Sequence, residues 1–256
     1  MPPDAAGYRP LMPEATDTNA AFWKSDEHIA QWVASADERE RHRRDQRRLL
    51  AELLPLDQQA AFTFIDLGAG TGAAARVVLD AYPNATAVLA DFSPQMMDEG
   101  AKALAPYAGR YRYVELDLAH GTWPEAMPAQ VPAVISSLCV HHLPDDRKRS
   151  LFAEILDRLT PGGWYLNYDV VAAGDPVVGE AWERAGDRRD PAAAEARHHR
   201  TPEQQRRYEN HVRYMIPLAP QLQFLAEVGF EGVDVYWKQL DAVIYGGRRP
   251  LLGATR

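Results

Sequence analysis

The sequence predicts an α/β fold, a doubly wound and mostly parallel sheet of about seven strands. Short apolar runs alternate with segments of helical apolar spacing, the pattern of strands covered by helices on both faces. The first run, residues 61–65, breaks into Gly68-x-Gly70-x-Gly72 and continues as a helical segment over 73–82. A strand, a glycine turn and a helix start make one βα unit of such a sheet, because glycine lets the backbone turn tightly and lie close to a ligand.

Two helices are expected before this unit. Residues 1 to about 20 are rich in Pro and polar residues, and we expect them to be loose. Apolar side chains at helical spacing then predict an amphipathic helix, namely Phe22, Trp23, Ile29, Trp32 and Val33. A second helix is predicted over 37–54 and is closed by Pro55. Its arginine run, residues 39–48, contains interspersed acids, which favours a solvated helix face.

Further strands follow the glycine turn, and polar residues mark their ends. The predicted strands are 87–90 before Asp91, 113–118 containing Asp117, 134–140 before His141-His142, and 164–168 before Asp169. Between the first two, Ser93 is expected to cap a helix with Pro94 at its first position. A helix over 151–159 is expected to stop at Thr160-Pro161-Gly162-Gly163. Cys139, the single cysteine, is expected to be a buried residue of the fourth strand.

A polar, helical segment over 172–217 interrupts the strand pattern after the fifth strand. Ligands of open α/β sheets bind at the carboxyl edge of the strands, so this segment is placed to cap a substrate. A helix over 221–228, stopped by Gly229, then precedes two runs at 233–237 and 242–245. These two runs predict a closing antiparallel hairpin.

Composition excludes several classes of function. The net charge of −8 argues against nucleic-acid binding, which depends on neutralising phosphates. No apolar stretch reaches the roughly 18 residues of a membrane span. The first residues lack the basic and apolar regions of a secretory signal, and a single cysteine excludes a disulfide framework. A cytoplasmic protein with no membrane and no nucleic-acid partner is therefore expected.

The order of these motifs resembles class I S-adenosylmethionine (SAM)-dependent methyltransferases of the small-molecule type, over residues 49–169 and again over 218–249. The resemblance implies a Rossmann-like, seven-stranded sheet with an antiparallel C-terminal hairpin, SAM as cofactor and S-adenosylhomocysteine as product. The expected organisation is a tail and helical lid over 1–56, a SAM-binding core over 57–171, a helical cap over 172–217 and completion of the core over 218–256.

The resemblance also assigns the cofactor site. Asp91 ends the second strand, where a carboxylate can accept hydrogen bonds from both hydroxyls of a ribose. In the family, the next residue, Phe92, packs on the adenine beside Met96, and Asp117 holds the adenine amino group. Asp117 can instead be a loop carboxylate that caps nearby amides. The residues expected at SAM are Asp66, Gly68, Ala69, Gly70, Gly72, Asp91, Phe92, Met96, Asp117, Leu118, Ser137 and Leu138.

Methyl transfer from a sulfonium is an in-line displacement, for which the protein aligns the acceptor, excludes water and takes a proton where needed. His141 and His142 follow the fourth strand, where the family places residues beside the reactive methyl, and are the predicted catalytic residues; a structural role is the alternative. The cap carries His198, His199 and His211. Adjacent residues on a helix point about 100° apart, so a paired His-His holds one ion poorly and no metal is expected.

The acceptor is expected to be a small molecule. The sequence has neither an Asn/Asp-Pro-Pro-Tyr motif after the fourth strand nor a cysteine placed to attack a pyrimidine, features that resembling enzymes use on nucleic-acid bases. Trp23, on the predicted lid, is expected to shield the sulfonium or to pack ordinarily. We expect methylation of an O or N atom, in secondary metabolism.

A second resemblance is patchy. Residues 175–180 and 203–211 are similar to carboxy-SAM synthases, which hold the added carboxylate of their product with an arginine, and Arg206 best matches it. Arg206 or Arg213 can equally bind an acidic substrate or form a surface ion pair. The alternatives are therefore an enzyme that makes or uses carboxy-SAM, and a SAM-binding partner or regulatory subunit without catalysis. The oligomeric state stays open, a homodimer included.

Overall fold

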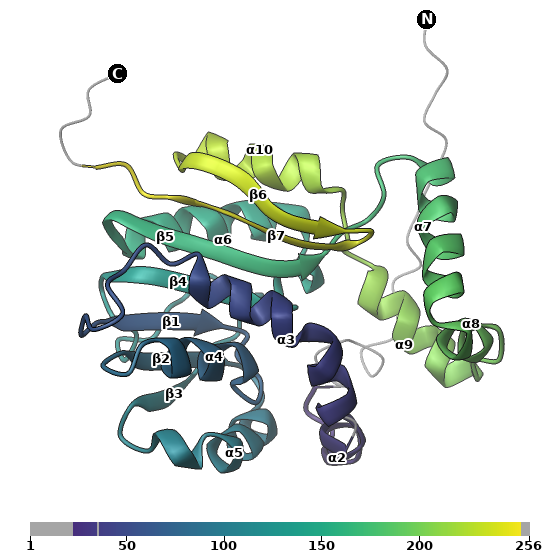
Figure 1. Ribbon diagram of the computed structural model, residues 1–256, viewed down its shortest axis with the longest axis horizontal. Helices are drawn as coiled ribbons and strands as arrows, with labels where there is room; N and C mark the ends of the chain where they lie inside the picture. The colour runs from purple at the N-terminus through teal and green to yellow at the C-terminus, as the bar shows by residue number, and fades with distance from the viewer. Residues whose placement is uncertain (1–22, 35, 252–256) are drawn as a thin grey trace, which may run out of the picture.

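A computed structural model describes residues 23–34 and 36–251. These described residues form one sheet of seven strands in the order β3-β2-β1-β4-β5-β7-β6 (Figure 1). The strands β1 (Thr63–Leu67), β2 (Thr86–Asp91), β3 (Tyr111–Glu115), β4 (Val131–Ser137) and β5 (Leu159–Val170) run parallel. The hairpin of β6 (Glu231–Gln239) and β7 (Ala242–Arg248) adds to β5 in the antiparallel sense. The expected seven-stranded, mostly parallel sheet is confirmed.

Alternate residues of each central strand enter two different cores. Ile65 and Leu67 of β1 face one cluster, which α6 (Asp145–Arg158) and α10 (Leu218–Val228) cover. Phe64 faces the other, which is covered by α3 (Ala36–Glu52) and α4 (Ala73–Ala81). Strands buried on both faces need continuous apolar sequence, and this explains why short apolar runs identified them.

The remaining helices lie near the carboxyl edge of the parallel strands. Figure 1 shows α2 (Asp26–Ala34) and the cap helices α7 (Pro176–Arg189), α8 (Pro191–His198) and α9 (Pro202–Val212) on that side of the molecule. Beside the sheet, α5 (Pro94–Ala103) is followed by the short helix η1 (Ala105–Tyr107), and η2 (Val140–His142) follows β4. Each cap helix begins with Pro after an Asp or Thr whose side chain accepts backbone N–H groups, a strong local start signal.

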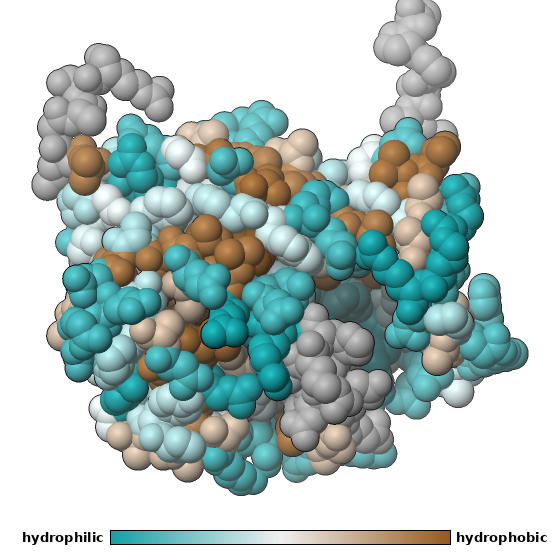
Figure 2. All heavy atoms as spheres, in the orientation of Figure 1, coloured by the Kyte–Doolittle hydropathy of each residue, from teal (hydrophilic) through white to brown (hydrophobic). Residues whose placement is uncertain are grey.

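Two surface features accompany the cap. None of its three helices contains a buried residue. An apolar patch lies at the start of α7 (Figure 2), where Val177 and Val178 are exposed. No helix in the described part of the chain is long and apolar enough to cross a membrane.

Local predictions at the helix ends are confirmed. The Ser93 hydroxyl accepts a hydrogen bond from the amide of Met96, with Pro94 at the first position of α5. Gly229 ends α10 in the left-handed conformation, with φ of 110°.

Three boundaries differ from expectation. The third strand ends at Glu115, before Asp117. The fourth ends at Ser137, because Leu138 turns the chain with φ of 57°, so Cys139 lies beyond the strand and is only partly buried. The preceding helix does end at Arg158, just before residues 160–163, but these residues belong to β5, which therefore begins earlier than expected and pairs with β4 across an irregularity in register.

The arginine run also departs from a purely solvated face. Arg47 is only 7% exposed and donates from Nε to the hydroxyl of Ser137, 3.3 Å away. It is buried because α3 packs on α4 and reaches β5, which places that side of the helix over the sheet edge. The side chains of residues 39–42 and the predicted lid residue Phe22 lie outside what the structure describes.

Candidate functional site

The glycine loop after β1 is a tight cradle of backbone. Gly68, Gly70 and Gly72 have φ of 65°, 54° and 76°, the left-handed region that favours glycine. The amides of Gly68 and Ala69 both donate to the carbonyl of Ala90, at 2.8 and 3.0 Å. The loop is therefore fixed to the end of β2 and leaves no room for side chains at its turns.

Neighbouring side chains leave little room for a Cβ at all three glycines of this loop. A Cβ on Gly68 would lie 2.1 Å from the sulfur of Cys139, and one on Gly70 would lie 3.0 Å from the terminal methyl of Met96. Met96 is buried on α5. The loop thus runs between Met96, which was expected at the cofactor, and Cys139, which was expected in the fourth strand.

Asp91, at the end of β2, binds the same loop. One carboxylate oxygen accepts from the amide of Gly70 at 2.7 Å, and the other accepts from the amide of Ser93 at 2.9 Å. The side chain is 7% exposed, and burial raises the pKa of its carboxyl, opposed by these backbone hydrogen bonds. A carboxylate has about four acceptor positions, so one on each oxygen remains for a ligand hydroxyl.

Asp66, inside β1, is a deeply buried acid of the site. It is 1% exposed, one oxygen accepts from the amide of Ala75 at 3.1 Å, and the other has no hydrogen-bond partner within the described part of the chain. Burial raises its pKa to about 7, while the Ala75 amide and the charge of Arg47 act in the opposite direction. An unpaired buried oxygen at the glycine loop is where the amino group of a ligand would be stabilised.

The sides of the loop carry further predicted residues. Phe92 is partly buried, and the ammonium of Lys24 lies 5.5 Å from its ring centroid, which brings the N-terminal segment to this region. Trp23 is partly buried and packs edge-to-face on Trp32, at 5.7 Å between centroids. Leu138, with its unusual φ, donates its amide to the carbonyl of Tyr168.

Asp117 shows the contacts of a loop-capping carboxylate. Its oxygens accept from the amide of Ala119 at 2.9 Å and contact the ring nitrogen of His120 at 3.0 Å, and its side chain is 42% exposed. Leu118 is buried, and its carbonyl accepts from Arg147 at 2.6 Å. Both residues follow β3 at the same sheet edge as Asp91, so the geometry is compatible with their proposed contact to an adenine.

The histidines after β4 are held by a buried acid. His141 is 2% exposed, its Nδ1 lies 2.5 Å from an oxygen of Asp169, and its backbone amide donates to the other oxygen at 3.0 Å. Asn167 donates to Asp169 and to the hydroxyl of Tyr245. A carboxylate on Nδ1 fixes the tautomer that leaves Nε2 as an acceptor.

One cap histidine joins this pair. The Nδ1 of His211, on α9, lies 3.4 Å from Nε2 of His141. Ring centroids of His141 and His142 are 3.9 Å apart, and that of His211 is 4.7 and 5.3 Å from them. His199 instead pairs with Glu195 on the exposed face of α8. The argument about adjacent helix residues, from which we expected no metal, did not consider this trio.

The two predicted substrate arginines lie at α9. Arg206 is exposed on that helix, and Arg213 directly follows it, with its guanidinium 5.9 Å from the ring of Tyr214. The helix contacts η2, so these residues belong to the element that carries His211 toward the sheet edge.

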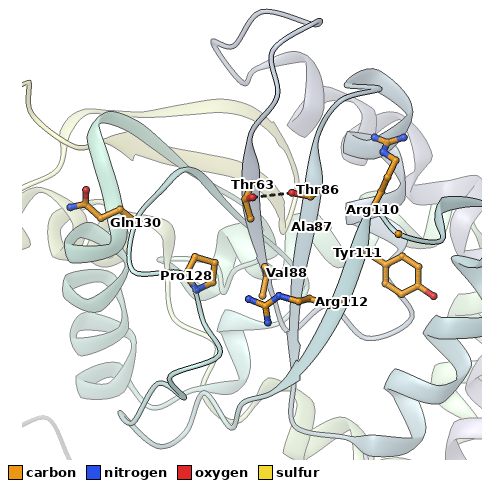
Figure 3. A pocket seen from close by; sticks show the side chains of 10 residues that line it. Thr63, Thr86, Ala87, Val88, Arg110, Tyr111, Arg112, Pro128 and Gln130 are labelled. Atoms are coloured by element: carbon orange, nitrogen blue, oxygen red, sulfur yellow. Dashed lines mark hydrogen bonds between the residues drawn. The ribbon is translucent and has the colours of Figure 1, made fainter.

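A separate open cavity of about 450 Å³ lies at the opposite edge, by the amino ends of the strands (Figure 3). Thr63 and Thr86, the first residues of β1 and β2, share a hydrogen bond at its wall. Arg110 lines it but donates to the backbone carbonyls of Leu79, Tyr82 and Ala85. Its guanidinium therefore stabilises the fold through these backbone contacts. The candidate functional site lies instead at the carboxyl edge of the parallel strands.

Comparison with known proteins finds methyltransferases similar to this chain. Residues 64–163 match the methyltransferase-domain family. A trans-aconitate 2-methyltransferase from Azoarcus sp. is 34% identical over 133 residues, 52% of this chain and 46% of that protein. The chain therefore spans less than half of that relative's length.

Solved structures show the same fold. An O-methyltransferase family protein from Burkholderia thailandensis aligns with a TM-score of 0.66 at 19% identity, covering 93% of this chain and 64% of that one. Human N-acetylserotonin methyltransferase, solved with SAM, aligns with a TM-score of 0.62 at 17% identity, covering 93% and 60%. Residues 64–163 therefore carry a methyltransferase domain, and the chain has the fold of these solved methyltransferases.

Sequence reasoning missed four residues of this edge: Arg47, Asp169 as the partner of His141, His211 and Lys148. Only Asp169 gave a local signal, as the acid that ends a strand beside the predicted catalytic histidines. The others reach the site through packing between distant elements.

Proposed function

We propose that this chain transfers the methyl group of SAM to an O or N atom of a small molecule bound between the sheet edge and the cap. The observation that carries the proposal is the arrangement at one edge of Asp91 bound to the Gly70 loop and of His141 bound to Asp169. The first pair fits the cofactor and the second faces the acceptor. A place in secondary metabolism remains a prediction from the sequence.

The cofactor contacts follow from the residues at the loop. Asp91 accepts from the ribose hydroxyls, while Phe92 and Met96 border the adenine, with Asp117 and Leu118 at its polar edge. Gly68 to Gly72 line the methionine portion, and the unpaired oxygen of Asp66 attracts its ammonium group. SAM would supply an activated methyl group on a sulfonium, and the chain aligns the acceptor with it.

In the acceptor half, His141 takes the proton of the hydroxyl or amine as the new bond to carbon forms. Asp169 holds the ring and stabilises the imidazolium that results. His142, Trp23 and the arginines at α9 line or close the acceptor space. The relative named for trans-aconitate supports acidic acceptors, which Arg206 or Arg213 would hold.

The test is turnover on a panel of small acceptors, followed by formation of S-adenosylhomocysteine. The panel contains phenols, amines and carboxylic acids, trans-aconitate among them. We expect at least one acceptor to be methylated, and His141→Gln to lower kcat while SAM affinity stays unchanged. SAM binding without turnover on any acceptor would favour a regulatory SAM-binding subunit instead.

A further inference from the structure

Three imidazoles from two distant parts of the chain converge on one point. His141 and His142 come from η2, and His211 comes from the cap helix α9. One nitrogen from each ring lies within 4.8 Å of the other two. Three nitrogens bound to one zinc-like ion at about 2.0–2.1 Å lie about 3.4 Å from one another, so small side-chain movements would complete the geometry.

Ring nitrogens of this trio lack good hydrogen-bond partners among the described residues. His141 uses Nδ1 for Asp169 and presents Nε2, whose contact is the 3.4 Å approach to Nδ1 of His211. Nδ1 of His142 is buried and has no hydrogen-bond partner. A buried polar atom without a partner costs free energy, which a bound cation would recover.

The two segments that bear the rings are fixed to each other. Lys148 is fully buried, and its ammonium donates to the carbonyl of Leu143, at 2.7 Å, and to that of Tyr214, at 2.5 Å. These carbonyls lie one residue after His142 and three residues after His211. The lysine therefore holds the cap against η2, so the three rings need no large movement to meet.

We infer that His141, His142 and His211 bind one divalent transition-metal ion of the zinc class, with Asp169 orienting His141. Imidazole nitrogen suits zinc, cobalt, nickel and copper. Three protein ligands leave a fourth position open, as in catalytic rather than structural sites. A ligating histidine whose other nitrogen is held by a carboxylate is the usual arrangement around such ions.

The chemical role of the ion rests on the proposed function. An acceptor hydroxyl at the open position would lose its proton to solvent, because the ion lowers its pKa. The resulting oxygen anion would then form the bond to the methyl carbon as the carbon–sulfur bond breaks and its electron pair passes to sulfur. Nε2 of His141 cannot bind the ion and take this proton at once, so the ion would replace His141 as the activating group.

The experiment is a zinc titration of untagged, chelator-stripped full-length protein in competition with a chromogenic chelator, without SAM. We expect one zinc per chain, and Co²⁺ in its place should give the visible absorption of a tetrahedral site. His211→Ala should weaken zinc binding at least about 100-fold, and Asp169→Asn about 10- to 100-fold. His199→Ala, an exposed cap histidine paired with Glu195, is the matched control and should bind as the parent does.

Failure of the site is distinguishable from failure of the proposed function. Absence of zinc binding, or equal binding by the parent and His211→Ala, would overturn the metal site even if SAM binds and turns over. Loss of binding in His199→Ala but not in His211→Ala would do the same, because it would place the ion elsewhere. Zinc bound as expected by a chain that does not bind SAM would contradict only the methyl-transfer proposal.

Discussion

Replacing Asp91 with Ala tests the cofactor site at its most specific contact. Each oxygen of this carboxylate already accepts one backbone amide, from Gly70 or Ser93, and each keeps a second acceptor position. The two ribose hydroxyls of SAM would use those positions. Loss of hydrogen bonds to a charged group costs about 1.5–3 kcal/mol, so the SAM dissociation constant should rise about 13- to 160-fold.

The measurement is calorimetric titration of the parent and the variant with SAM. Because Gly70 and Ser93 lose their acceptor in the variant, urea unfolding must show separately how far stability falls. Asp91→Asn, which keeps the shape of the side chain, guards against a variant that does not fold. Asp98→Ala, an exposed acid on the next helix, is the control and should leave SAM affinity unchanged. Unaltered affinity in folded Asp91 variants would refute the placement of the ribose.

Three further predictions concern stability. The pKa of Asp66 is raised from its ordinary value of 3.8 to about 7, so its neutral form stabilises the native state below pH 4. This contribution, up to about 4 kcal/mol, is lost as pH rises through 7. Asp66→Asn should remove this pH dependence of the unfolding free energy, measured by urea unfolding at pH 4 to 8, and the same pH dependence in parent and variant would contradict the prediction. Gly68→Ala should destabilise the protein by about 1–3 kcal/mol more than Gly109→Ala. Both glycines have positive φ, but only at Gly68 would the new Cβ collide with a side chain, that of Cys139. Equal losses of unfolding free energy would show that this collision does not matter. Lys148→Met should lower the free energy of unfolding by about 2–4 kcal/mol, because the carbonyls of Leu143 and Tyr214 lose their donor. A smaller loss in urea unfolding would mean that water replaces the ammonium.

The sequence brought the residues of the proposed cofactor half together because their signals are local. Asp91 and the glycines stand at the ends of apolar runs, and Ser93-Pro94 marks a helix start within three residues. Parallel strands bring such ends to one edge of a sheet, so chain order alone placed them together.

The acceptor half depends on contacts that no local pattern contains. His211 lies 70 residues from His141, and its approach follows from how α9 docks on η2. Arg47 looked like part of a solvated run, because burial of one face of α3 depends on α4 beneath it. The early end of β4 at Ser137 follows from the left-handed Leu138, a conformation that an apolar residue rarely adopts and that its sequence does not indicate.

Mass spectrometry of the small molecules bound to the protein tests the central claim most directly. Purified protein is mixed with excess SAM, freed of unbound ligand by gel filtration, and denatured to release what it holds. SAM or S-adenosylhomocysteine in near-equimolar amount is the predicted result. Retention of neither would contradict a SAM site at the Gly70–Asp91 loop, and release of a species heavier than SAM by the mass of carbon dioxide would transfer the assignment to carboxy-SAM.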